Sequence, residues 1–344
     1  QPKGPAMKGD KVTSTQVAER AGVSQAAVSR VFTPGASASL KITDKVRRAA
    51  TELGYRPNVL ARSLITGKSH IIGLVVAYLE NQFYPEAIEK LSKTLQIHGY
   101  HVLVFMASND EKANQSVIDE LLDYQVDGII TASVSMSNAL TARCEAAGIP
   151  IILFNRLQDD ARLSGVSSDN FRGGYKLAEF LIQSGHQQIA HIAGWKGAST
   201  QRDREAGFMS GLAAHNMALF DRTEGNFHYE QAQQAARDLF AKQDQPDAVF
   251  VANDHMAFAA MDVVRFELGL RIPEDVSFVG YDDVALAAWP SYDLTTVRQP
   301  ANRMVTETVQ MLLARIDNPD AEPRRVSIDG PLIIRGSAKQ PEGT

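Results

Sequence analysis

Apolar residues recur with helical spacing in two short segments between residues 12 and 32, VTSTQVAERAGVSQAAVSRVF. Side chains three or four positions apart share one face of a helix, so each segment predicts a short amphipathic helix. The apolar face of the first helix consists of Val17, Ala18 and Ala21, and that of the second consists of Ala27, Val28 and Val31. The pattern predicts two short helices with a tight turn between them.

Polar residues and a glycine mark the ends of these two helices. Thr13 can cap the first helix, and Gln16 three residues later completes a capping box. Gly22 stands where the chain must leave the helix in a left-handed conformation, which glycine adopts at the least cost. Ser24 can cap the second helix. Caps at both starts therefore support the helix boundaries that the apolar pattern predicts.

The second helix leaves a short polar face outward, formed by Gln25, Ala26, Ser29 and Arg30. This face suits a DNA major groove, because an amide can pair with adenine at two atoms and an arginine with guanine or phosphate. The plain alternative is a helical hairpin with a solvated face, since the motif is short.

A third helix is expected from about residue 40 to 53, where Val46, Ala49, Ala50 and Leu53 form a core-facing stripe. We expect an all-α headpiece over residues 12–57, preceded by a disordered leader over residues 1–11. Residues 58–68 form an unusually apolar linker that is too short for a stable helix alone. It is either an interdomain joint or a hinge that folds only against DNA and a partner hinge.

From residue 71 onward, buried apolar runs alternate with amphipathic helices, the pattern of parallel sheets covered on both faces. Two such series predict an α/β core of two similar lobes over residues 69–340, with a cleft where strand carboxyl ends meet. We expect lobe 1 over about 69–166 and 297–322, and lobe 2 over about 167–296 and 323–340. The expected helices of the core span residues 85–98, 114–124, 138–147, 171–184, 202–215, 229–242, 255–268 and 301–315.

Charge is distributed unevenly along the 344 residues. Residues 1–68 contain 12 Lys and Arg against four Asp and Glu, whereas the whole chain has a net charge of -5. A basic head on an acidic body indicates a polyanion bound at one end only. No apolar run is long enough to cross a bilayer, and no signal-peptide segment is present, so we expect a cytoplasmic protein that does not contact a membrane. The single cysteine, Cys144, fits a reducing compartment.

Motifs of catalysis and of cofactor or metal binding are missing from the sequence. No Gly-rich dinucleotide or Walker sequence occurs, no Gly-x-Ser-x-Gly elbow is present, and His186 and His191 have no companion at metal-ligand spacing. The glycines of Gly194–Thr200 are explained by loop geometry. We therefore expect no cofactor, no metal and no enzymatic activity.

Polar side chains stand instead at the ends of the predicted strands. Asn155 and Arg156 follow one strand, while Asn253 and Asp282 end two others. Amide, carboxylate and guanidinium groups at a cleft edge suit a hydroxyl-rich small molecule. Singly, such residues are more often helix caps or surface ion pairs, and Asp254 is a good N-cap candidate for the following helix.

Over nearly its whole length the chain resembles the LacI/GalR family of bacterial transcription regulators. The residues that carry the resemblance are VTSTQVAERAGVSQAAVSRVF, ELGYRPNVLARSL, IIGLVV, SGHQQIAHIAG, QRDREAGF, VANDHMAFAAM, IPEDVSFVGYDD and LTTVRQP. The resemblance implies a helix-turn-helix headpiece, a hinge helix and a two-lobed, periplasmic-binding-protein-like core that dimerises.

Residue roles follow from the same resemblance, by position. The implied DNA-binding residues are Thr13, Ser24, Gln25, Ala26, Ser29, Arg30, Asn58, Ala61 and Leu64, with Leu64 wedged into the minor groove. The implied effector-binding residues are Tyr84, Asn155, Arg156, Arg204, Phe227, Asn253 and Asp282. Many members of the family carry Asp where this chain has Asn155, which changes the usual contact with a sugar hydroxyl.

We therefore expect a repressor that binds a near-palindromic double-stranded operator as a homodimer and is controlled by a small effector. Asp282 can accept two hydroxyl hydrogen bonds and Arg204 can donate several, which favours a sugar or sugar derivative over a purine. Arg156 beside Arg204 adds the possibility of a sugar acid, unless Arg156 forms a surface ion pair with Asp159 or Asp160. Other classes are a solute-binding transport component, disfavoured by the basic head, and a sugar-handling enzyme.

Overall fold

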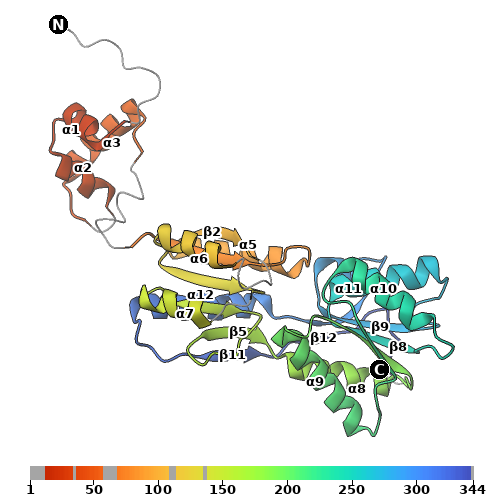
Figure 1. The fold of residues 1–344 in the computed structure, drawn as a ribbon. Coiled ribbons are helices and arrows are strands. Elements are labelled where there is room, and N and C mark those ends of the chain that lie inside the picture. The colour runs from red at the N-terminus through yellow and green to blue at the C-terminus, as the bar shows by residue number, and fades with distance from the viewer. Residues whose placement is uncertain (1–11, 34–35, 57–67, 108–113, 135–137, 342–344) are drawn as a thin grey trace. The chain divides into compact units, whose positions relative to one another are not determined.

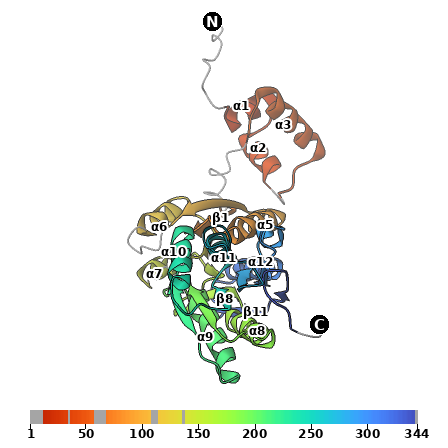
Figure 2. The same cartoon turned by 90° about the vertical axis from the view of Figure 1, so that its right-hand side faces the viewer.

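The computed structural model describes residues 12–33, 36–56, 68–107, 114–134 and 138–341. Contacts group the chain into two units, residues 1–69 and 70–344, which we call the headpiece and the core. Figures 1 and 2 show the elements of both units, and each unit is described by itself. The expected leader and the expected hinge up to residue 67 lie outside the described residues, including Asn58, Ala61 and Leu64.

The headpiece contains the three expected helices, α1 (Ser14–Ala21), α2 (Gln25–Phe32) and α3 (Leu40–Leu53). Gly22 ends α1 with a left-handed φ of 66°, as the sequence predicts. Val17, Val28 and Val46, one from each helix, are fully buried in a single apolar cluster. Burying a valine side chain contributes about 1.5–3 kcal/mol, so these three positions hold the small headpiece together.

The core contains two six-stranded sheets, which confirms the expected two-lobed α/β fold. The first sheet has the order β11-β5-β4-β3-β1-β2 with all pairs parallel. Its strands are β1 (Ile71–Val76), β2 (His101–Met106), β3 (Gly128–Ala132), β4 (Ile151–Phe154), β5 (Ser164–Ser168) and β11 (Arg325–Ile328). The apolar runs IIGLVVA, HVLVFMA, DGIITA and PIILFN predict β1 to β4, whereas no apolar run predicts β5 or β11.

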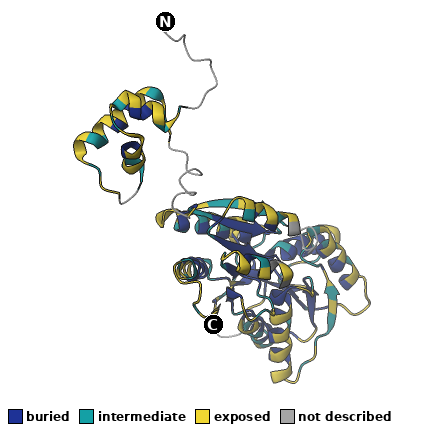
Figure 3. Cartoon of the chain, turned by 60° about the vertical axis from the view of Figure 1, so that its left-hand side comes forward, coloured by how far each residue is buried: buried dark blue, intermediate teal, exposed yellow. Residues whose placement is uncertain are grey.

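The second sheet has the order β12-β10-β9-β8-β6-β7, parallel except for β12 against β10. Its strands are β6 (Ile189–Ala193), β7 (Asp221–Glu224), β8 (Ala248–Val251), β9 (Ser277–Asp282), β10 (Thr295–Arg298) and β12 (Leu332–Ile333). Buried residues concentrate in the strands of both sheets (Figure 3). Helices cover the sheets, as expected for parallel strands.

Helices gather around each sheet as two separate groups (Figure 1). Around the first sheet lie α5 (Phe83–Ile97), α6 (Asn114–Asp123), α7 (Asn138–Ala146) and α12 (Ala301–Asp317), with α12 against α5, β4 and β5. Around the second lie α8 (Asn170–Gln183), α9 (Ser199–Ala214), α10 (Tyr229–Phe240) and α11 (Asp254–Asp262). The expected helix over 255–268 changes at residue 263 into a wider π-helical turn, Val263–Glu267.

One expected lobe boundary is wrong. Residues 323–340 were all assigned to lobe 2, but β11 pairs in parallel with β5 and so completes the first sheet. Only β12 returns to the second sheet, where it pairs with β10. The chain therefore crosses between the lobes three times, before α8, after β10 and after β11. The polar sequence of β11, RVSI, hid this strand, because half of its residues are exposed.

None of the helices in the described ranges combines the length and apolar character that crossing a bilayer requires.

Candidate functional site: the outer face of α2 and the cleft of the core

Local capping fixes the orientation of α2 in the headpiece. The Ala27 amide donates to Ser24 Oγ at 3.2 Å, as the sequence predicts for an N-cap. Thr13 caps α1 in the same way, and its own amide donates to Gln16 Oε1 at 2.8 Å, which completes the capping box. With Ala27 and Val28 buried, the opposite face of α2 must point to solvent.

The four expected DNA-facing residues of α2 are all exposed: Gln25, Ala26, Ser29 and Arg30. Gln25 Nε2 donates to Ser14 Oγ at 2.9 Å, which joins this side chain to the start of α1. Its Oε1 acceptor and second N–H can still serve the edge of a base. Arg30 Nε contacts the Ala26 carbonyl at 3.4 Å, so its guanidinium lies along the same face.

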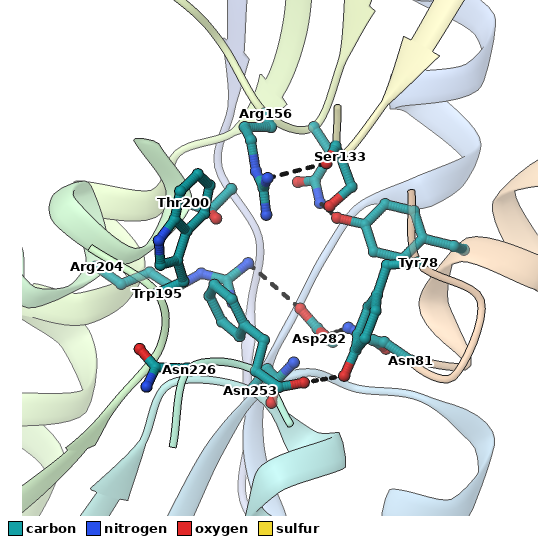
Figure 4. A pocket seen from close by; sticks show the side chains of 13 residues that line it. Tyr78, Asn81, Ser133, Arg156, Trp195, Thr200, Arg204, Asn226, Asn253 and Asp282 are labelled. Atoms are coloured by element: carbon teal, nitrogen blue, oxygen red, sulfur yellow. Dashed lines mark hydrogen bonds and ion pairs between the residues drawn. The ribbon is translucent and has the colours of Figure 1, made fainter. Parts of the chain in front are cut away.

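In the core, a pocket opens where the strands of both sheets end (Figure 4). All seven side chains expected to bind an effector line it: Tyr84, Asn155, Arg156, Arg204, Phe227, Asn253 and Asp282. Its empty space is about 480 Å³, part of which is open to solvent.

Close helix packing positions Arg204. A Cβ on Gly174 of α8 would lie 2.0 Å from the Arg204 carbonyl oxygen, so α8 and α9 can approach only with glycine there. The Arg204 guanidinium donates to Asn170 Oδ1 at 2.9 Å, to the Ala252 carbonyl at 2.7 Å and to Asp282 Oδ1 at 3.3 Å. Arg204 is 2 % exposed. Three of its five N–H groups are thus used within the protein, which leaves fewer for a ligand than the sequence suggested.

Asp282 receives hydrogen bonds from both lobes. Gln299 Nε2 donates to its Oδ1 at 2.7 Å, and Asn81 Nδ2 from lobe 1 donates to its Oδ2 at 2.9 Å. Together with the Arg204 contact, three of about four acceptor positions are occupied. We expected two acceptor positions for ligand hydroxyls, whereas the structure leaves about one unless a ligand displaces Asn81.

Two buried carboxylates, Asp282 of the pocket lining and Asp254, influence each other's charge. Burial raises the pKa of Asp282, and the Arg204 charge acts against this rise. Burial and the neighbouring Asp282 together raise the pKa of Asp254 to about 7. Asp254 accepts hydrogen bonds from Thr296 Oγ1 at 2.6 Å and from the Val284 amide at 3.0 Å. It therefore ties α11 to the second sheet.

Asn253, not Asp254, caps α11, so that expectation was wrong. Asn253 Oδ1 accepts from the Met256 amide at 3.0 Å, while Asp254 occupies the first helical position. Asn253 is extended, with φ at -152°, as N-caps usually are. The cap fixes its oxygen, so its Nδ2 group is the donor that remains for the pocket.

Asn155 and Tyr84 form the lobe 1 wall. Asn155 Nδ2 donates to Tyr84 Oη at 3.0 Å, while Asn155 Oδ1 is buried without a hydrogen-bond partner among the described residues. Asn155 has a left-handed φ of 69°, which asparagine tolerates better than most residues. A buried acceptor on a pocket wall is available to a ligand hydroxyl.

Arg156 is buried on the same wall, with 6 % of its surface exposed, which rules out the surface ion pair that we considered. Its Nη1 donates to the Ser133 carbonyl at 2.9 Å, and its guanidinium lies 5.4 Å from the ring centre of Trp195 (Figure 4). The two carboxylates considered as partners have other contacts: Asp160 pairs with Arg162, and Asp159 lies 3.9 Å from Arg202.

Phe227 enters the pocket from the loop after β7. Its φ of 66° is left-handed, and its ring covers Gly194, where any Cβ would lie 2.2 Å from the ring. Tyr78 from lobe 1 donates its hydroxyl to the Phe227 carbonyl. Like the bond between Asn81 and Asp282, this contact joins the two lobes directly across the cleft.

Sequence reasoning missed several residues of the pocket lining: Tyr78, Asn81, Ser133, Trp195, Thr200 and Asn226. Most of them follow a strand by one to five residues, so a longer search beyond each strand end would have found them. Trp195 and Thr200 belong to the segment Gly194–Thr200, whose glycines we explained by loop geometry alone. Within the described ranges, no three His, Cys, Asp or Glu side chains could share a metal ion.

Family models match both units of the chain. A model described as bacterial regulatory proteins, lacI family, matches residues 15–58, and a model of periplasmic binding proteins and the sugar binding domain of the LacI family matches residues 69–336. A probable HTH-type transcriptional repressor, ExuR of Bacillus subtilis strain 168, is 30 % identical over 336 residues, covering 96 % of this chain and 99 % of that protein.

Two solved structures are similar over the whole chain. The lac repressor dimer bound to operator and the anti-inducer ONPF has a TM-score of 0.86 at 28 % identity, covering 95 % of this chain and 99 % of that one. A complex of the transcriptional regulator CelR with cellobiose has a TM-score of 0.72 at 30 % identity, covering 95 % and 100 %. The chain therefore belongs to the LacI family of bacterial regulatory proteins and is a DNA-binding transcriptional regulator with an effector-binding core.

Proposed function

We propose that this protein is a repressor that binds a near-palindromic operator as a homodimer. One headpiece offers only a small reading surface, and a two-fold dimer presents two such surfaces to two half-sites. Gln25, Ala26, Ser29 and Arg30 would face the major groove, with Thr13 and Ser24 near the phosphates. The similar lac repressor structure is a dimer bound to operator, which supports this arrangement. A protein that regulates chromosomal genes acts in the cytoplasm.

The hinge would complete DNA binding. By their positions in the sequence, Asn58 and Ala61 would contact the minor groove, and Leu64 would wedge between two base pairs at its centre. An apolar side chain gains nothing in a solvated linker, whereas an unstacked base step can cover it. The wedge would also bend the operator, so its contribution depends on the sequence at the centre of the site.

In the core, the seven expected residues would hold a hydroxyl-rich molecule and would not catalyse a reaction. The buried Asn155 Oδ1 atom and the remaining acceptor position of Asp282 suit hydroxyl donors. The Phe227 ring supplies an apolar face that suits a sugar ring. The similar regulator CelR was solved with cellobiose, which supports a sugar or sugar derivative.

Contacts across the cleft would couple the effector to DNA binding. The bonds from Asn81 to Asp282 and from Tyr78 to the Phe227 carbonyl favour the arrangement in which the two lobes meet, as does the Leu157 amide, which donates to Ser199 Oγ at 3.0 Å. A ligand can shift the lobe equilibrium only by its difference in affinity for the two arrangements. A molecule that competes for Asp282 acts on one of these contacts directly.

The observation that carries the proposal is the pocket itself, where side chains of both lobes that suit a ligand meet at the strand ends. The other unit of the same chain, the headpiece, exposes the polar face of α2. The test begins with selection of operators by the full-length protein from random DNA duplexes. We expect the selection to enrich an inverted repeat. The affinity of the protein for this repeat should change at least tenfold when the effector, identified from a panel of sugars and sugar acids, is added. Binding without sequence preference would contradict the operator, and an unresponsive operator complex would contradict the sugar effector.

A solute-binding transport component, the second class that we considered, shares the architecture of the core. The headpiece argues against it, because the match over residues 15–58 is to bacterial regulatory proteins.

A further inference from the structure

The pocket lining carries more positive than negative charge. Among its described residues, the acidic and strongly basic side chains are Arg156, Arg204 and Asp282. Asp282 has a single ionisable carboxyl group and so contributes at most one negative charge. A guanidinium group stays protonated in proteins. The two arginines therefore leave an excess of at least one positive charge on the lining.

The two arginines have different surroundings. The charge of Arg204 is matched by Asp282 in its own lobe, and its guanidinium lies 3.7 Å from the ring centre of Tyr281. Arg156 reaches the cleft from lobe 1, between the Ser133 carbonyl and the Trp195 ring of lobe 2. Burial, with a smaller effect from the Arg204 charge, lowers the pKa of Arg156. Removal from water thus disfavours the charged form of Arg156, and a ligand anion would offset this cost.

The positions of the other groups suggest how a ligand would lie. Trp195 stands next to Arg156, and Phe227 of the same lobe lines the same pocket, so the lining offers two aromatic rings besides the two arginines. Asn155 Oδ1 and Asp282 offer acceptors, and Asn253 Nδ2 offers a donor. A ligand that is anionic at one end and rich in hydroxyl groups elsewhere would pair with an arginine and also bind these hydrogen-bond acceptors and donors.

We propose that the effector is a monocarboxylic sugar acid whose carboxylate pairs with Arg156, an inference that rests on the proposed sugar-responsive regulator. The hydroxyl groups of the sugar acid bind the acceptors and donors around Asp282 and Asn253. A planar carboxylate matches the fork of a guanidinium. A sugar phosphate carries the same kind of charge, and the experiment separates the two sources of an anion.

The experiment is calorimetry on the full-length protein with matched pairs of sugars that differ only at one carbon. The pairs are D-glucose with D-glucuronate, D-galactose with D-galacturonate and D-mannose with D-mannuronate, and D-glucose 6-phosphate is the phosphate probe. We expect the acid of at least one pair to bind at least tenfold more tightly than its neutral sugar and than the phosphate. This comparison uses the unaltered protein and depends on the folding of no variant.

Variants then assign the effect to one side chain. Arg156→Gln should reduce the preference for the acid to within about twofold, and Arg156→Lys should keep part of it because the charge remains. Arg202→Gln is the matched control: this arginine lies near the pocket with its side chain half exposed, it does not line the pocket, and its loss should leave the preference unchanged. An unchanged preference in Arg156→Gln would overturn the assignment.

The outcomes separate this inference from the proposed function. A neutral sugar that binds as tightly as its acid and changes operator affinity would overturn the acidic effector and leave the sugar-responsive regulator standing. Tighter binding of the phosphate would overturn the carboxylate. If no sugar, acid or phosphate binds or alters operator affinity, both the inference and the proposed sugar effector fail.

Discussion

Replacing Asp282 by asparagine tests the centre of the cleft with almost no change of shape. The carboxylate accepts on Oδ1 from Arg204 and Gln299, and on Oδ2 from Asn81. In Asp282→Asn, one oxygen becomes an NH₂ group that cannot accept. The remaining oxygen should stay on the side of Arg204 and Gln299, where two donors converge. The new NH₂ group then faces the NH₂ group of Asn81, and the contact between the lobes is lost.

The structure sets the size of both expected effects. Arg204 and Asp282 are 2 % and 3 % exposed, so solvent does not screen their interaction. Removing one member of a buried ion pair costs about 3–5 kcal/mol, and we expect about 3 kcal/mol because the amide oxygen still accepts. A ligand hydroxyl would lose a hydrogen bond to a charged group, about 1.5–3 kcal/mol. That loss weakens effector binding by about 10- to 150-fold.

The measurement pairs calorimetry of the tightest-binding sugar acid with urea unfolding. Asp283→Asn is the matched control, because the Asp283 side chain is also buried and pairs with two arginines at 2.6 Å, Arg298 and Arg335, yet does not line the pocket. Both variants should lose stability and keep operator binding, but only Asp282→Asn should lose effector affinity. Equal effector affinity in the wild type and in Asp282→Asn would refute the assignment of Asp282 to the binding site.

Three further predictions concern the headpiece, the hinge and the buried carboxylate. Leu64→Ala should weaken operator binding by roughly 2–3 kcal/mol in a fluorescence anisotropy titration, with calorimetric effector affinity unchanged; unaltered operator affinity would mean that the segment is only a tether. Gln25→Ala should cost about 1–3 kcal/mol on the selected operator and relax the preference at one base pair, whereas an equal loss on all sequences would indicate a phosphate contact. The folded core keeps a proton on Asp254 up to about pH 7, while an unfolded aspartate releases it near 3.8. The free energy of unfolding of the wild type relative to Asp254→Asn should therefore fall between about pH 4 and pH 7 in urea titrations, and a constant difference would contradict the raised pKa.

The strands that the sequence predicted are those with continuous apolar runs. Ile71–Val76 and Ala248–Val251 are apolar runs in the middle of sheets, and both appeared as expected. Two missed strands, β5 and β10, are also buried but contain Ser164, Ser167, Thr295 and Thr296. The hydroxyl groups of Ser164, Thr295 and Thr296 bond to chain segments far away in sequence, such as Thr296 to Asp254. Local apolar patterning therefore does not reveal these strands.

The residues of the pocket lining fall into two similar groups, those that local sequence patterns locate and those that depend on contacts between distant parts of the chain. Asn253 and Asp282 stand at element ends that hydrophobic periodicity locates, so their positions marked them, whereas Arg204 lies inside α9 and was implied by the family resemblance. Tyr78 and Asn81 act through contacts to the opposite lobe, with partners about 150 and 200 residues away in sequence. The pairing of Asn81 with Asp282 depends on how the lobes meet, which strand and helix patterns do not encode.

The three crossings of the chain between the lobes also affect the order in which the protein can be completed during synthesis. The headpiece, residues 12–56, can close its core as soon as it leaves the ribosome. Neither sheet of the core is whole until its last strand arrives, β11 at residues 325–328 and β12 at 332–333. A nascent chain therefore carries a finished DNA-reading unit while both lobes still have an unpaired edge. A premature stop anywhere between residues 300 and 325 removes a strand from each sheet and damages both lobes together.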